Sequence, residues 1–165
     1  MSVQNPAIGP DLARSIEQFL YREALYMDEH RYRDWFDMLH DDMLYWVPCN
    51  AADGDPRQMT SIIYERKPQI NERLRRLEGG TAYAQSPRSA LVRIVSNIVI
   101  EACGDDSATV SSTFSLGEWR PTREVHWFGR TRYRLTRSGD DWKILEKKVV
   151  LMNNDAFMPN MTFLV

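Results

Sequence analysis

Metal-binding side chains are scarce in this 165-residue sequence. It has two cysteines, Cys49 and Cys103, and three histidines, His30, His40 and His126, all far apart along the chain. A Rieske cluster requires two cysteines and two histidines, and a mononuclear non-haem iron site requires two histidines and a carboxylate. Neither cysteine lies in a Cys-x-His or Cys-x-x-Cys pair, so we expect free thiols and no metal or cofactor in this chain.

Long apolar runs and a strong excess of one charge are also lacking. No run of about 18 apolar residues could span a bilayer, and the N-terminal residues lack the basic and apolar regions of a secretory signal. The net charge of −2 provides no positive field for nucleic acid or an anionic membrane. Common nucleotide-binding and serine-hydrolase motifs are absent. We therefore expect a cytoplasmic protein that binds neither nucleic acid nor a membrane.

The first half of the chain has the apolar spacing of helices. Apolar residues recur with a period near 3.6 over residues 12–27, 32–39 and 70–77, which predicts three helices. A polar break at 28–30 predicts a bend between the first two. The aromatic-rich run 43–47 predicts a short strand.

From residue 90 the pattern changes to a period of two, which predicts antiparallel strands joined by short turns. In the first of these strands we expect one alternating set to face the core: Val92, Ile94, Ile98 and Ile100. In a later strand, one face carries Trp127, Tyr133 and Leu135, and the other carries Phe128, Arg130, Arg132 and Arg134.

The length fits one domain, 1–165, with a helical part at about 10–80, a sheet part at about 90–151 and a C-terminal tail at 152–165. Helices followed by antiparallel strands indicate an α+β fold with the helices on one face of the sheet. A curved sheet could then wrap around the helices.

An open conical fold can host acid–base chemistry, because an apolar cavity shifts the pKa of a carboxyl or imidazole group inside it. The residues that could serve in such a pocket are Asp28, His30, Asp34, Tyr45 and His126. In the alternative interpretation, Asp28 and His30 cap and bend a helix while Tyr45 packs in the core.

The basic stripe on the predicted strand also has two interpretations. Arg130, Arg132 and Arg134 can form a solvated face, but arginine beside an aromatic residue such as Phe128 is enriched at protein interfaces. The apolar end of the chain, 158–165, needs somewhere to dock.

Several segments together resemble one family. These are FLYREALYMDEHRYRDWFDMLHDDMLYWVP, RIVSNIVI, WFGRTRYRLTRSGDDWKILEKKVVLMNND and the ending NNDAFMPNMTFLV. In this order and spacing they resemble the β subunits of aromatic-ring-hydroxylating dioxygenases, which are related in fold to scytalone dehydratase and nuclear transport factor 2. The resemblance covers nearly the whole chain.

The resemblance implies a cone of strongly twisted, mixed sheet with the N-terminal helices packed in its mouth. It implies a non-catalytic, structural subunit that joins catalytic α subunits, three of each, with β–β contacts in a trimeric base. The Rieske [2Fe-2S] cluster and the mononuclear Fe(II) would belong to the α subunit. Electrons would come from NADH through a reductase and sometimes a ferredoxin. The complete enzyme would convert an arene, such as an aromatic carboxylate, to a cis-dihydrodiol.

Under this resemblance no catalytic or metal-binding residue is expected in this chain. The expected subunit contacts are Trp119, Phe128, Arg130, Arg132, Asn153, Asn154, Asp155, Phe163 and Leu164. Two alternatives remain open. One is a stand-alone dehydratase, isomerase or cyclase that uses a His–carboxylate pair on the same cone, and the other is a ligand-binding or assembly module without an attached enzyme.

Overall fold

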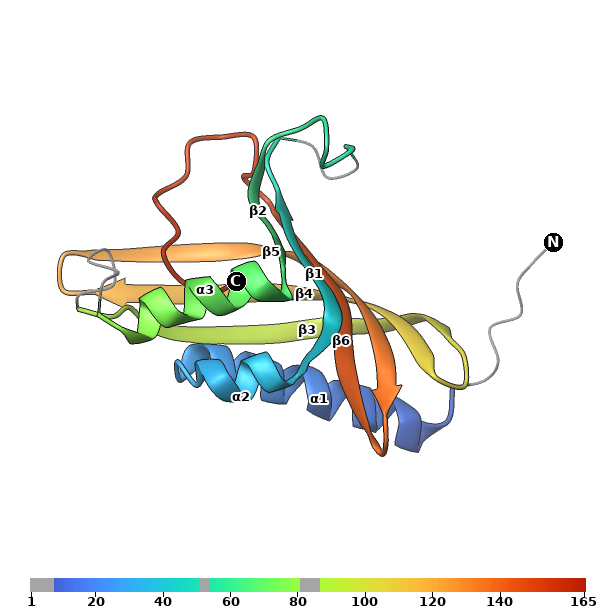
Figure 1. Ribbon diagram of the computed structural model, residues 1–165. Helices are drawn as coiled ribbons and strands as arrows, with labels where there is room; N and C mark the ends of the chain where they lie inside the picture. The colour runs from blue at the N-terminus through green and yellow to red at the C-terminus, as the bar shows by residue number, and fades with distance from the viewer. Residues whose placement is uncertain (1–7, 51–53, 81–86) are drawn as a thin grey trace.

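A strongly curved sheet encloses the helices on its concave side (Figure 1). The computed structural model describes residues 8–50, 54–80 and 87–165. Within these ranges the elements are α1 (Pro10–Asp28), α2 (Tyr32–Asp37), β1 (Leu39–Pro48), β2 (Ser61–Arg66), α3 (Lys67–Glu78), β3 (Ala90–Cys103), β4 (Ser107–Arg120), β5 (Arg123–Ser138) and β6 (Asp141–Leu151). No helix in these ranges is long and apolar enough to cross a bilayer.

The strands of the described residues form one sheet in the order β2-β1-β6-β5-β4-β3. All neighbours pair antiparallel except β1 and β6, which run parallel, so the sheet is mixed. The two edges are β2 and β3, and α1 lies along β3. The predicted α+β class, with helices before a curved mixed sheet, is confirmed.

The predicted bend lies between α1 and α2. Glu29 ends the first helix, and His30 has a φ of 55°, a left-handed conformation that turns the chain back on itself. Tyr32 and Trp35, on the second helix, are buried in the core. The third predicted helix is also present, as α3, and it ends at Glu78 before Gly79.

The predicted facing of β3 is wrong for its first half. Val92 and Ile94 are exposed, whereas Ile98 and Ile100 are partly buried and pack against the core. The cause is a β-bulge between Ser96 and Val99, where Asn97 has a φ of 50°. Because the bulge adds one residue to this strand, it exchanges the inward and outward positions on either side. The facing expected of Phe128 and the arginines in β5 is confirmed.

The C-terminal segment returns between α3 and the sheet (Figure 1). Its last residues, Phe163, Leu164 and Val165, are buried. The ring of Phe163 meets Trp127 edge to face, with ring centres 5.6 Å apart. The apolar end of the chain therefore docks inside the cone and completes its core.

Candidate functional site

A buried ion pair lies at the centre of the cone. Glu23 of α1 accepts a hydrogen bond of 2.8 Å from the Nζ of Lys147 in β6, and both side chains are at most 2% exposed. The same carboxylate accepts hydrogen bonds from Tyr133 Oη, at 2.8 Å, and Trp35 Nε1, at 3.1 Å. Burial lowers the pKa of Lys147, and the charge of Glu23 opposes that effect. The pair fixes α1 against the sheet.

A second ion pair joins α1 to the edge strand β3. Asp28 Oδ1 accepts a hydrogen bond of 2.6 Å from Arg93 Nε, and Asp28 Oδ2 accepts one of 2.8 Å from the backbone N–H of the same residue. Arg93 Nη2 also donates to the carbonyl of Leu164, at 3.0 Å. An edge strand exposes unpaired backbone groups, so Asp28 covers part of this edge while Arg93 holds the C-terminal segment.

A second buried carboxylate, after that of Glu23, is Glu118 of β4. It accepts hydrogen bonds from Ser89 Oγ, at 2.7 Å, and Trp127 Nε1, at 3.1 Å. Arg123 Nη2 lies 3.3 Å from it and Arg120 Nε lies 3.5 Å from it. A buried charge requires this degree of compensation, and its partners make it a structural group.

The enclosed space that remains around Glu23, Lys147 and Val165 is about 10 Å³, room for at most one water molecule. Val165, which lines this space, is held by Tyr45: the buried Tyr45 hydroxyl accepts a hydrogen bond from Val165 N–H, at 3.0 Å, and donates to Val165 O, at 2.5 Å. Burial raises the pKa of Tyr45. An arene or a carbonyl substrate does not fit in this volume.

The five residues considered for an acid–base pocket lie in different places. Asp28 pairs with Arg93 and Tyr45 with Val165, as described above. His30 Nδ1 lies 3.0 Å from Tyr32 Oη and its Nε2 lies 2.9 Å from the carbonyl of Ser89. Burial lowers the pKa of His30, so the neutral ring is favoured in the folded protein. The histidine links the α1–α2 bend to the start of β3.

The other two pocket candidates are exposed. Asp34 pairs on the surface with Arg31, at 2.8 Å. His126 lies on the outer face of the sheet, with its Nε2 3.3 Å from Glu124 Oε1. The structure therefore does not bring these two residues together with His30 and Tyr45.

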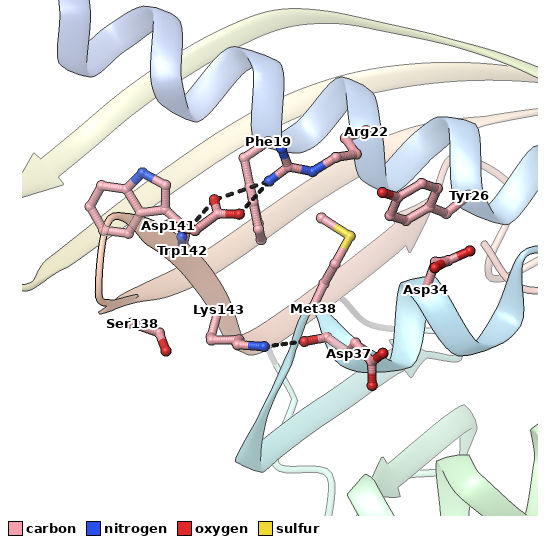
Figure 2. A pocket seen from close by; sticks show the side chains of 10 residues that line it. All are labelled: Phe19, Arg22, Tyr26, Asp34, Asp37, Met38, Ser138, Asp141, Trp142 and Lys143. Carbon is pink, nitrogen blue, oxygen red and sulfur yellow. Dashed lines mark hydrogen bonds and ion pairs between the residues drawn. The ribbon is translucent and has the colours of Figure 1, made fainter.

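A polar groove of about 540 Å³ runs between α1, α2 and the β5–β6 turn (Figure 2). Across it, the Arg22 guanidinium reaches the carboxylate of Asp141, at 2.7 Å, and the Lys143 ammonium donates to the carbonyl of Asp37. Phe19 lies between these two contacts. The groove is open, and many of its side chains pair across it or pack in the core, so its contacts join α1 and α2 to the β5–β6 turn.

The candidate contact residues of the sheet lie on its outer face. Trp119 and Phe128 are both 55% exposed, which is unusual for side chains of this size. Arg130 and Arg132 follow Phe128 on the same face of β5 and are exposed. Arg132 reaches Glu101 of β3, at 2.9 Å. These four residues share one accessible surface.

The candidate contacts of the C-terminal tail are divided. Asn153 and Asp155 are exposed, and the carbonyl of Asn154 accepts a hydrogen bond of 2.9 Å from the backbone N–H of Asn50. Phe163 and Leu164 pack inside the core of this chain, so their side chains are not on its surface.

Sequence reasoning missed the three buried charges, although a signal was present for each. Glu23 lies on the same helical stripe as Phe19 and Met27, and these three residues are buried. Lys147 is two residues before the buried Val149, so its side chain points to the same, inward face of the strand. Glu118 is two residues after the buried Leu116 and points inward for the same reason. A charged residue at a position that the alternating pattern assigns to the buried, apolar face predicts a buried partner for its charge.

The residues present do not fit an iron centre. Among the described residues, which include every histidine and cysteine, no cluster of three or more His, Cys, Asp or Glu could hold a metal ion. His30 contacts neutral oxygens, His40 Nδ1 accepts a hydrogen bond from Asp42 N–H, and His126 lies on the outer face. Iron chemistry is therefore not assigned to this chain.

Comparison with known proteins identifies relatives over most of the chain. The family model of the ring-hydroxylating β subunit matches residues 22–156. The β subunit of 3-phenylpropionate/cinnamic acid dioxygenase from Photorhabdus laumondii is 32% identical over 159 residues, 90% of this chain and 88% of the relative. The crystal structure of the β subunit of benzoate 1,2-dioxygenase from Burkholderia mallei matches with a TM-score of 0.76 and 26% identity, over 96% of this chain and 99% of that one. An NTF2-like protein from Novosphingobium aromaticivorans shares the fold, with a TM-score of 0.62 at 13% identity, over 87% of this chain and 84% of that one.

Proposed function

Because the chain belongs to the ring-hydroxylating β-subunit family, we propose that it is the non-catalytic subunit of an aromatic-ring dioxygenase and holds the catalytic α subunits in position. The observation that carries this proposal is the filled cone. An enzyme of the dehydratase type needs a cavity with an acid–base pair, and here the volume beside Glu23 and Lys147 is about 10 Å³, with the C-terminal Val165 in its lining.

We infer that the Rieske cluster, the mononuclear iron and the substrate pocket all lie in the α subunit. The complex would contain three subunits of each kind, with β–β contacts at its base. NADH would supply electrons through a reductase, with or without a ferredoxin, and these proteins would dock on the α subunit. The two free cysteines support a location in the cytoplasm, where thiols stay reduced.

The substrate class is inferred from the relatives. One is named for 3-phenylpropionate and cinnamic acid, and another for benzoate. All three compounds are aromatic carboxylates, so we propose that the complete enzyme converts an aromatic carboxylate to a cis-dihydrodiol. The choice of substrate would depend on the α subunit, because the filled cone offers no room for the ring.

The test is co-expression of this chain with a catalytic α subunit of an aromatic-ring dioxygenase from the same organism, followed by native mass spectrometry and metal analysis. We expect a complex with equal numbers of both chains, and iron only in preparations that contain the α subunit. Dihydroxylation of benzoate should require both chains. Stoichiometric iron in the chain purified alone, turnover by it, or failure to associate with the α subunit would overturn the proposal.

A further inference from the structure

Residues 157–165, which we call the terminal strap, reach the core without joining the sheet. Within the described ranges the last strand, β6, ends at Leu151, so all the strands are formed by residues that precede the strap. The strap begins at Phe157, which is 92% exposed, and then returns to the cone, where residues 163–165 are buried (Figure 1). It therefore docks on a sheet that is complete without it.

Side chains of the cone hold the backbone of the strap. The Tyr45 hydroxyl pairs with both the N–H and the carbonyl of Val165, at 3.0 and 2.5 Å. The Arg93 guanidinium donates to the carbonyl of Leu164, at 3.0 Å. Proteins bind extended peptides in a comparable way, with fixed groups that pair with the peptide backbone and a pocket for a side chain.

The side chain that enters the cone is aromatic. The Phe163 ring is 2% exposed and meets the ring of Trp127 at 77°, with centres 5.6 Å apart. One residue earlier, the Thr162 hydroxyl accepts a hydrogen bond of 3.2 Å from Arg120 Nη2. A buried aromatic side chain within a polar rim is the usual anchor of a bound peptide.

The groups that hold the strap are themselves fixed by other parts of the chain. Arg93 is paired with Asp28, at 2.6 Å, and the indole N–H of Trp127 donates to Glu118, at 3.1 Å. Tyr45 lies in β1, which pairs with a strand on each side. Because these partners all lie outside the strap, the site keeps its shape when the strap leaves. Such preorganisation is what a binding site needs.

We propose that the cone is a preformed binding site for an apolar peptide segment with an aromatic anchor, and that the terminal strap is a separable ligand that occupies this site. The tether gives the strap an effective concentration of roughly millimolar order, which keeps the cone filled in the intact chain. Release of the strap is then a local opening in which the sheet stays folded. This inference goes beyond the proposed function, because it concerns the chain without an α subunit.

The test removes the tether from the folded protein. A protease site is inserted between Ala156 and Phe157, which are both exposed, and the folded chain is cut there. The uncut insertion variant serves as the reference. We expect the cut fragment to exchange with a fluorescent peptide of residues 157–165 faster than the rest of the chain unfolds, while the circular dichroism stays unchanged. Fluorescence anisotropy then gives the Kd of the peptide.

Two peptides with the same substitution separate anchoring from general stickiness. Phe163→Ser removes the buried ring and should raise Kd at least about tenfold. Phe157→Ser makes the same change at an exposed position, so this control peptide should bind as the wild-type peptide does. In the protein, Tyr45→Phe removes the hydroxyl that pairs with Val165 and should raise Kd about fivefold or more.

Three results would overturn the inference. The first is loss of the folded circular dichroism spectrum when the tether is cut. The second is a fragment that leaves only when the whole chain unfolds. The third is an equal loss of affinity for the Phe157→Ser and Phe163→Ser peptides.

Discussion

Removal of one partner of the buried pair Glu23–Lys147 should destabilise the protein strongly. In Lys147→Met the carboxylate of Glu23 keeps its contacts to Trp35 and Tyr133 but loses its counter-charge, at a position that is 1% exposed. Breaking a buried pair in this way costs about 3–5 kcal/mol. For a domain of this length, roughly 2–4 °C per kcal/mol gives a decrease in Tm of about 6–20 °C.

The assay is urea unfolding followed by tryptophan fluorescence, with Tm from circular dichroism. The double variant Glu23→Gln/Lys147→Met leaves no buried charge, and the amide oxygen can still accept a hydrogen bond from Tyr133 or Trp35. It should recover at least half of the loss. The control is Lys148→Met, one residue further along β6 on the outer face, which should cost less than about 1 kcal/mol. A loss below about 1 kcal/mol for Lys147→Met, or no recovery in the double variant, would refute the reasoning.

Three further perturbations test other parts of the structure. Burial lowers the pKa of His30 from 6.5, so the unfolded chain takes up this proton more readily. The free energy of unfolding of the wild type should therefore fall as the pH drops below 6.5. The fall should be smaller in His30→Asn, because asparagine tolerates the left-handed backbone and does not titrate here. Equal pH profiles of the two proteins would contradict this. A Cβ at Gly129 would lie 2.3 Å from a backbone oxygen of β6, so Gly129→Ala should lower the free energy of unfolding in urea by about 1–3 kcal/mol. The control Gly117→Ala should cost little, because its Cβ would lie 3.9 Å from the nearest atom, a backbone oxygen. Tyr45→Phe leaves the N–H of Val165 without its partner, and a loss of about 1–3 kcal/mol in the same assay is expected.

The sequence was sufficient for the parts of the fold that depend on local periodicity. The helix at 12–27 was predictable because apolar residues with a period of 3.6 need one buried stripe. The facing of β5 followed from strict alternation of Trp127, Tyr133 and other apolar residues with arginines. In both elements the backbone is regular, so counting residues is enough to assign a side chain to a face.

The remainder depends on contacts between distant segments. The exposure of Val92 is set by the bulge at Asn97, and periodicity alone does not reveal where a strand gains a residue. Glu23 and Lys147 are 124 residues apart, so their pairing follows from the arrangement of α1 against β6. The filling of the cone by Phe163 and Val165 likewise requires the path of the whole chain.

The bulge at Asn97 also has an evolutionary consequence. If one residue were deleted there, the first half of β3 would turn over, so that Val92 would point inward and Arg93 would leave its carboxylate. Substitutions in this strand change one side chain at a time, whereas an insertion or deletion would invert a whole segment. We therefore expect lineages of this protein to vary the residues of the strand while preserving its length.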